Sequence, residues 1–117
     1  MWTVRTEREG SKALLTDYQK NIIRKLIIVS TIEETIKSGE MWTHLNKVMG
    51  DKAPSRASVI FFLNDLVKYG YADFKDATSK GGHVKMYYSR VSKEQFEKKV
   101  YIDINNKLKD ALDKIFI

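Results

Sequence analysis

The sequence predicts a single domain that is mainly α, with a small β-hairpin wing. The first observation is an amphipathic helix over residues 55–69, which Ser55 can cap and Gly70 can end. The second is a pair of strand-like runs, residues 71–75 and 83–90, that follows this helix directly. The third is a chain of 117 residues with 43% hydrophobic residues and no cysteine, which is enough for one core and excludes disulfides.

Residues 1–13 show no sustained helical or strand period, and we expect them to form an N-terminal arm. Acidic and basic side chains alternate there. This mixture favours a terminus that is mobile or packed on a partner over one that follows a phosphate backbone.

The first helix begins at Thr16 or Asp17 and has a wide apolar face, which predicts burial. The residues on this face are Tyr18, Ile22, Ile23, Leu26, Ile27 and Val29. The spacing favours one long or kinked helix that ends at Ser38. A break near Ser30 is the alternative, because a capping-box pattern follows it.

The middle of the chain has the order of a helix-turn-helix. We expect a short strand over residues 41–43, a short helix over residues 44–49 and a turn over residues 50–54. The apolar residues of the short helix should face the core: Leu45, Val48 and Met49. A short helix, a turn and a Ser-capped second helix, followed by a hairpin, make a winged helix-turn-helix, which we assign to residues 14–91.

Residues 92–117 form the last predicted helix. Ser92 and Gln95 have capping-box spacing, and apolar residues recur behind them at steps of three or four. These residues are Phe96, Val100, Ile104, Leu108, Leu112 and Ile115. We expect the stripe to pair with its copy in a homodimer, so this is a C-terminal dimerisation helix. Folding back on the first helix is the monomeric alternative.

The charge of the chain favours an anionic partner. The formal net charge is +6, and residues 44–90 carry eight Lys or Arg against four Asp, a net of +4. Nucleic acid is the commonest partner of a small basic domain. Because most of the excess lies in the helix and hairpin region, we expect double-stranded DNA to bind there.

Three segments resemble those of a known family: LTDYQKNIIRKL in the first helix, SRASVIFFLNDLVKYGY in the DNA-reading helix, and SKGGHVKMYYSRVSKEQF in the wing and last helix. They are similar to the winged-helix transcriptional regulators of prokaryotes, particularly small archaeal and bacterial repressors of the penicillinase-repressor and antibiotic-resistance-regulator types. The resemblance covers roughly residues 14–100. It implies a homodimeric regulator, expected to be a repressor, that binds an operator.

In such an architecture the start of the helix over residues 55–69 enters the major groove, where Ser55, Arg56 and Ser58 are the available polar groups. Arg56 can donate two hydrogen bonds to a guanine edge, or it can bind a phosphate or a nearby carboxylate. Ser55 is better explained as a cap than as a contact.

Two apolar residues depart from the family pattern. Related repressors commonly have polar or basic side chains where this chain has Ile60 and Phe61. If these residues face outward, they can contact thymine methyl groups or a protein partner. If one is buried, the base-reading surface shrinks.

The wing is expected as a loop over residues 76–83 that contacts the DNA backbone or minor groove. Its glycines allow a tight turn and a close approach, and its cations suit phosphate contacts. The residues that we assign to it are Lys80, Gly81, Gly82, His83 and Lys85. An ordinary hairpin with solvated lysines is the alternative.

Other classes of function have little support. The only histidines, His44 and His83, lie outside any recognisable metal or triad motif, so we expect neither an enzyme nor a cofactor. The longest apolar run, residues 26–29, is too short to cross a bilayer, and a cytoplasmic location is expected. The competing functions are a protein-interaction module that docks through Ile60 and Phe61, and a non-specific architectural DNA binder. Nothing in the sequence demands a small-molecule effector.

Overall fold

The computed structural model describes residues 1–117, apart from the side chain of Ser79. Within this part of the chain it has four α-helices and a three-stranded antiparallel sheet of order β1–β3–β2. The elements are a 3-10 helix Gly10–Ala13, α1 Asp17–Thr31, β1 Ile36–Lys37, α2 Ser38–Met49, a 3-10 helix Gly50–Lys52, α3 Arg56–Lys68, β2 Ala72–Ser79, β3 Gly82–Ser89 and α4 Lys93–Ile115. The predicted fold class, mainly α with a small hairpin, is confirmed.

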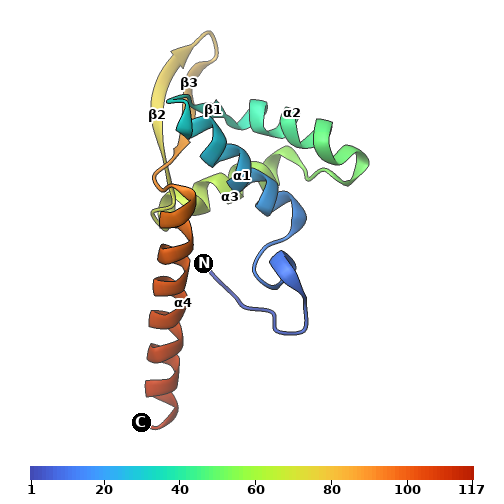
Figure 1. The fold of residues 1–117 in the computed structure, drawn as a ribbon. Helices are drawn as coiled ribbons and strands as arrows, with labels where there is room; N and C mark the ends of the chain where they lie inside the picture. Colours follow the sequence, from blue (N-terminus) through green and yellow to red (C-terminus); the bar gives the residue numbers. More distant parts are fainter.

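Helices α1, α2 and α3 form the body of the molecule (Figure 1). The β2–β3 hairpin and α4 leave this body in opposite directions, so the molecule is elongated, with a long dimension of 56 Å (Figure 1). The hairpin tip and the end of α4 therefore lie at opposite ends of the molecule.

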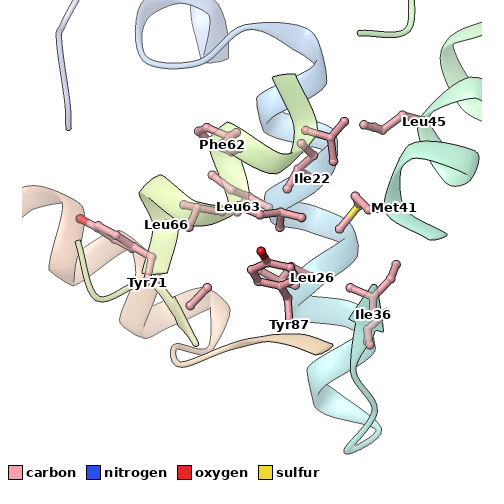
Figure 2. Close-up of a cluster of buried hydrophobic side chains, with 14 of the residues drawn as sticks. Ile22, Leu26, Ile36, Met41, Leu45, Phe62, Leu63, Leu66, Tyr71 and Tyr87 are labelled. Atoms are coloured by element: carbon pink, nitrogen blue, oxygen red, sulfur yellow. The ribbon is translucent and has the colours of Figure 1, made fainter. Parts of the chain in front are cut away.

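The core lies between the three body helices and the sheet. The largest of its fully buried side chains come from α1, α2 and α3: Ile22, Met41, Leu45, Val59, Leu63 and Leu66. Figure 2 shows Ile22, Met41, Leu45, Leu63 and Leu66 converging. Tyr71 and Tyr87 close the sheet side and are each 2% exposed. Apolar residues at helical spacing on α3 thus do what their period predicts, because one face of this helix is wholly inside.

Helix α1 ends at Thr31, so the favoured prediction of one helix up to Ser38 is wrong and the alternative break near Ser30 is confirmed. The capping-box pattern after the break starts no new helix, because the next element is β1. After the break, Glu33 adopts a left-handed backbone with φ of 58°. Ile36 then pairs with Tyr87 of β3 and is only 5% exposed. Burial of Ile36 in the sheet stabilises the extended path over a continued helix.

The first strand lies earlier than predicted, because Met41–Thr43 belong to α2 and β1 is Ile36–Lys37. The backbone N–H of Lys37 donates to the Glu40 carboxylate at 2.9 Å, which satisfies a free amide just before the helix. Met41 is then fully buried on the inner face. Val48 was expected inside and is instead 52% exposed.

The end of α3 follows the sequence prediction. Gly70 has φ of 84°, a conformation that glycine adopts without strain. The N–H of Tyr71 donates to the carbonyl of Leu66 at 2.8 Å, and that of Gly70 donates to the carbonyl of Val67 at 3.1 Å. These two bonds form a Schellman motif, which turns the chain directly into β2.

The hairpin is longer and its loop shorter than predicted. Residues 76–79 and 82–83, expected in a loop, belong to a ladder that runs from the pair Ala72–Ser89 to the pair Ser79–Gly82. Only Lys80 and Gly81 form the turn. The small polar residues of β2 have weak strand propensity, but pairing with β3 satisfies their backbone groups.

The N-terminus packs into the core, which the expectation of an arm over residues 1–13 did not foresee. Trp2 is 6% exposed, and its indole N–H donates to the Tyr71 hydroxyl at 2.7 Å. Its ring also meets Tyr71 and Phe96 edge to face, with centroids 5.4 and 6.0 Å apart. Trp2 therefore joins the end of α3 to the start of α4.

The start of α4 agrees with the predicted capping box. The backbone N–H of Ser92 donates to the Gln95 side chain at 2.9 Å, and the N–H of Gln95 donates to the Ser92 hydroxyl at 3.2 Å. These reciprocal bonds define where the helix begins.

Candidate nucleic-acid interface

The N-terminus of α3 is exposed and capped as predicted. The Ser55 hydroxyl accepts from the backbone N–H of Ser58 at 3.2 Å, and the two hydroxyls lie 3.0 Å apart. The cap satisfies one of the free amides of the first turn. Both serines therefore have a local structural role at the start of the helix.

Arg56 is exposed and lies over the start of α2. A Cβ atom built on Gly39 would lie 3.2 Å from a guanidinium nitrogen of Arg56, so the absence of a side chain at Gly39 leaves room for the arginine. In the part of the chain that the structure describes, the ion pairs are Lys99–Asp103 and Lys114–Asp110, and neither involves Arg56. The guanidinium charge is therefore available to a ligand.

An open groove of about 600 Å³ lies between α3, the start of α2 and β3. Its lining includes Lys37, Gly39, Arg56, Ile60, His83 and Lys85. The lining includes three cationic side chains and one carboxylate. The cations are Lys37, Arg56 and Lys85, and the carboxylate is Glu40, which already accepts from the Lys37 amide. This groove brings together the predicted residues Arg56, His83 and Lys85 on one cationic surface.

The hairpin presents lysines on both of its faces. Lys85 lies 4.6 Å from the centroid of the Phe74 ring, and Lys75 lies 5.8 Å from that of Tyr88. Stacking on an aromatic face restrains a lysine without removing its charge. Lys80 is exposed in the turn. The hairpin thus combines cations along its length with one at its tip.

A buried tyrosine fixes the position of the hairpin relative to α3. The Tyr87 hydroxyl donates to the Asn64 side chain at 2.8 Å, and burial raises the pKa of Tyr87 above its ordinary value of 10.0. Since a neutral hydroxyl is needed for this donation, the bond persists throughout the neutral range. The groove is therefore bounded by two elements that are tied together.

Sequence reasoning missed Lys37, Gly39 and Asn64 as part of this surface. Lys37 and Gly39 were assigned to the end of a long first helix, and only the true position of β1 brings them beside Arg56. Asn64 lies two helical turns after Arg56, and that spacing alone could have placed it on the same side of α3.

The structure answers the question of where Ile60 and Phe61 lie. Phe61 is 71% exposed, on the side of α3 that faces away from the buried Val59, Leu63 and Leu66. Ile60 is partly buried and lines the groove. The outer side of α3 is therefore not lost to the core, and the exposed ring of Phe61 lies on it.

The six residues assigned to dimerisation divide into two sets. Val100 is buried in the core of its own chain, and Phe96 and Ile104 pack against that core. The remaining three are exposed by about half or more: Leu108, Leu112 and Ile115. Only the second half of α4 keeps its apolar stripe open.

Metal binding and membrane insertion find no support among the described residues. The described residues include no group of three or more His, Asp or Glu side chains that could hold a metal ion. Partial burial and the charges of Lys25 and Lys47 lower the pKa of His44, which favours its neutral form. In the part of the chain that the structure describes, no helix is both long and apolar enough to span a bilayer.

Comparison with known proteins finds no matching family model and no matching curated protein. Solved structures do match. One from Methanosarcina mazei, provisionally named a transcriptional regulator, has a TM-score of 0.61 at 14% identity and covers 86% of this chain and 77% of its own. Another provisionally named regulator, from Thermoplasma acidophilum, has a TM-score of 0.52 at 12% identity, with coverages of 83% and 93%.

A third match is the Orc1 protein of Aeropyrum pernix in complex with DNA, with a TM-score of 0.57 at 15% identity. It covers 76% of this chain, but this chain spans only 24% of that protein. The shared arrangement of helices and hairpin decides the fold. The fold is a winged helix-turn-helix. Helices α2 and α3 are the helix-turn-helix, and the β2–β3 hairpin is the wing.

Proposed function

We propose that this protein is a transcriptional regulator that binds double-stranded DNA as a homodimer and represses transcription from its operator. Helix α3 enters the major groove, and the wing contacts the backbone or minor groove. The regulator acts in the cytoplasm. The observation that carries the proposal is the unpaired Arg56 at the exposed N-terminus of α3, beside the cations of the wing.

The physical argument combines charge and shape. An exposed helix N-terminus offers free amides and a positive dipole end to a phosphate, and the major groove admits one helix. The wing adds Lys75, Lys80 and Lys85, whose charges suit phosphates without regard to sequence. Winged-helix neighbours that include a DNA complex support the same reading.

The first experiment selects duplexes from a random-sequence pool at about physiological salt and at several-fold higher salt. A two-fold symmetric motif among the selected duplexes supports a dimeric regulator. Salt-sensitive binding without enrichment would instead favour an architectural DNA binder, because phosphate contacts alone carry no sequence information. Absence of binding would contradict the proposal.

Substitutions separate the two kinds of contact. Lys80→Ala with Lys85→Ala should weaken binding to all sequences. It should reduce the salt slope of the homodimer by about four, since each protomer loses two phosphate contacts and each contact contributes roughly one. Arg56→Ala should relax preference at one base pair in each half-site, by about 1–3 kcal/mol per half-site. Lys109→Ala, an exposed cation on the distal part of α4, is the matched control and should change neither quantity.

The dimer part of the proposal rests on the exposed stripe of α4. Leu108, Leu112 and Ile115 are 54%, 48% and 65% exposed and share one side of a helix that projects from the body (Figure 1). Because roughly half of each side chain is already covered, burying the rest against a second copy gains roughly half of the 1.5–3 kcal/mol that a fully exposed side chain would gain. Two-fold pairing would also place two copies of α3 on one duplex.

Sedimentation or light scattering across a concentration series tests the dimer. Leu108→Glu with Leu112→Glu should give a monomer at all concentrations and weaken operator binding. Ile32→Glu, at a side chain that is 62% exposed at the end of α1, is the control and should remain dimeric. A wild-type protein that is monomeric at high concentration would contradict this part of the proposal.

A further inference from the structure

Phe61 is the most exposed aromatic side chain on α3, and it does not pack in the core. Its ring is 71% exposed, whereas the neighbouring Phe62 is 6% exposed and packs inside. An aromatic ring left in water forgoes the stabilisation of roughly 1.5–3 kcal/mol that burial of such a side chain brings. Binding of a ligand that covers the ring would therefore be favourable.

The surface around Phe61 narrows the identity of that ligand. Ala57 is exposed one turn earlier on the same side of α3, and Ile60 lines the adjoining groove. Two polar groups beside this patch are engaged locally: Ser58 bonds to Ser55, and Asn64 accepts from Tyr87. The exposed Asp65 lies one turn after Phe61, beyond these two turns. The outer side of the first two turns is thus apolar at its centre.

Cations border this apolar patch. Arg56 lies one turn before Ile60, and Lys37 and Lys85 line the same groove from the neighbouring strands β1 and β3. A partner that covers Phe61 must place an apolar group between negative charges. The major groove of DNA does so where it displays the C5-methyl group of thymine between two phosphate backbones.

We propose that Phe61, with Ala57 one turn earlier, contacts thymine C5-methyl groups and so gives the half-site a requirement for thymine. The inference rests on the proposed function, because it assumes that α3 lies in the major groove. Guanine preference comes from Arg56, and thymine preference comes from the apolar patch. The operator half-site thus contains both a hydrogen-bonded position and a methyl-dependent one.

The test replaces thymines of the selected duplex, one at a time, by deoxyuridine, which keeps base pairing and lacks only the methyl group. At one or two positions per half-site, affinity of the wild-type protein should fall about fourfold, as expected for removing one methyl-sized group from an apolar contact. At the same positions 5-methylcytosine should bind more tightly than cytosine, since it restores the methyl group.

Protein variants test the same contact from the protein side. Phe61→Ala should weaken binding to the thymine duplex and should no longer respond to deoxyuridine at those positions. Ile32→Ala, an exposed aliphatic side chain far from α3 in the chain, should behave as wild type.

The outcomes are distinguishable from failure of the proposed function. A selected duplex that binds specifically but tolerates every deoxyuridine overturns this inference and leaves the regulator intact. A Phe61→Ala variant that binds the selected duplex as tightly as wild type also overturns it and moves Phe61 to a protein contact. Failure of the wild-type protein to bind any duplex overturns both proposals.

Discussion

The two halves of α4 have the same apolar spacing and opposite surroundings. Phe96, Val100 and Ile104 pack on or within the core, whereas Leu108 and Leu112 of the same stripe are about half exposed. The helix has 23 residues, or about 35 Å, and the body of the domain reaches only its first part (Figure 1). An apolar stripe therefore identifies a face that needs cover, but it does not say what covers it.

The N-terminus makes the difference between the two halves. Trp2 packs against Tyr71 and Phe96, and Lys107 reaches back to the Trp2 carbonyl at 3.5 Å. A polar chain accompanies this packing: the Tyr71 hydroxyl donates to Asp103, and Asp103 pairs with Lys99 at 3.4 Å. Beyond this region no part of the described chain lies against α4 (Figure 1).

Removal of Trp2 should have the largest effect on the free energy of unfolding. Trp2→Ala should lower the free energy of unfolding by about 3 kcal/mol, because it leaves a cavity against Tyr71 and Phe96. Urea unfolding at several protein concentrations measures this loss and separates it from any effect on dimerisation.

The control for that substitution is Trp2→Phe, which keeps a ring but removes the indole N–H donor to Tyr71. It should cost less than Trp2→Ala, about 1–2 kcal/mol. If Trp2→Ala costs under about 1 kcal/mol, the N-terminus does not cover the first half of α4 in solution.

Tyr71→Phe should have the next largest effect. The hydroxyl accepts from Trp2 at 2.7 Å and donates to Asp103, so its loss leaves a donor and an acceptor without their partner. We expect a cost of about 1–2 kcal/mol at neutral pH, measured by urea unfolding. Tyr101→Phe, at a side chain that is 70% exposed on the same helix, should cost almost nothing.

The same variant gives a pH test. Burial and the hydrogen bond to Asp103 raise the pKa of Tyr71 above its ordinary value of 10.0. The unfolded chain therefore loses this proton first as pH rises, and the stability present below pH 10 declines above it. Because phenylalanine lacks the proton, the gap between wild type and Tyr71→Phe should shrink above pH 10, by at most about 1.4 kcal/mol per pH unit. A gap that stays constant would contradict the role of this hydroxyl.

Single residues show which parts of the structure could be predicted from the sequence. Ser55, Gly70 and Ser92 act as predicted, because caps and left-handed glycines depend on neighbours a few residues away. Trp2 could not be placed in the same way. Its partners Tyr71 and Phe96 lie far along the chain, and a pattern of neighbouring residues cannot predict such a contact.

The candidate site shows the same limit. The position of Arg56 at the start of α3 was predictable from the Ser55 cap, and the cations of the wing were predictable from composition. Lys37 and Gly39 were not, because their place depends on the pairing of Ile36 with Tyr87 across the sheet. A strand of two residues leaves too short a pattern to find in a sequence.

Truncation of one apolar side chain in each half of α4 should have different costs in the two halves. Val100→Ala removes two methyl groups from a side chain that is 8% exposed and should cost roughly 1.5 kcal/mol, at about 0.8 kcal/mol for each group. Leu112→Ala, at 48% exposure, should change the stability of the monomer by no more than about 0.5 kcal/mol. Both are measured by urea unfolding in a background that carries Leu108→Glu to prevent association. Equal costs would mean that the distal half is also covered within one chain.

The two ion pairs of α4 provide the smallest and most discriminating test. Lys114 and Asp110 lie 3.0 Å apart, closer than Lys99 and Asp103 at 3.4 Å, so distance alone would rank the distal pair as the stronger. Solvent reverses that order, because the distal side chains are 67% and 66% exposed and the proximal ones only 32% and 35%. Asp110→Asn should therefore cost only about 0.3 kcal/mol, and urea unfolding in roughly 1 M salt should abolish even that difference. Asp110 lies on the side of α4 opposite Leu108 and Leu112, so a dimer that buries the apolar stripe leaves this pair in water. A cost above about 1 kcal/mol that survives salt would show that this opposite side of α4 is also buried in solution.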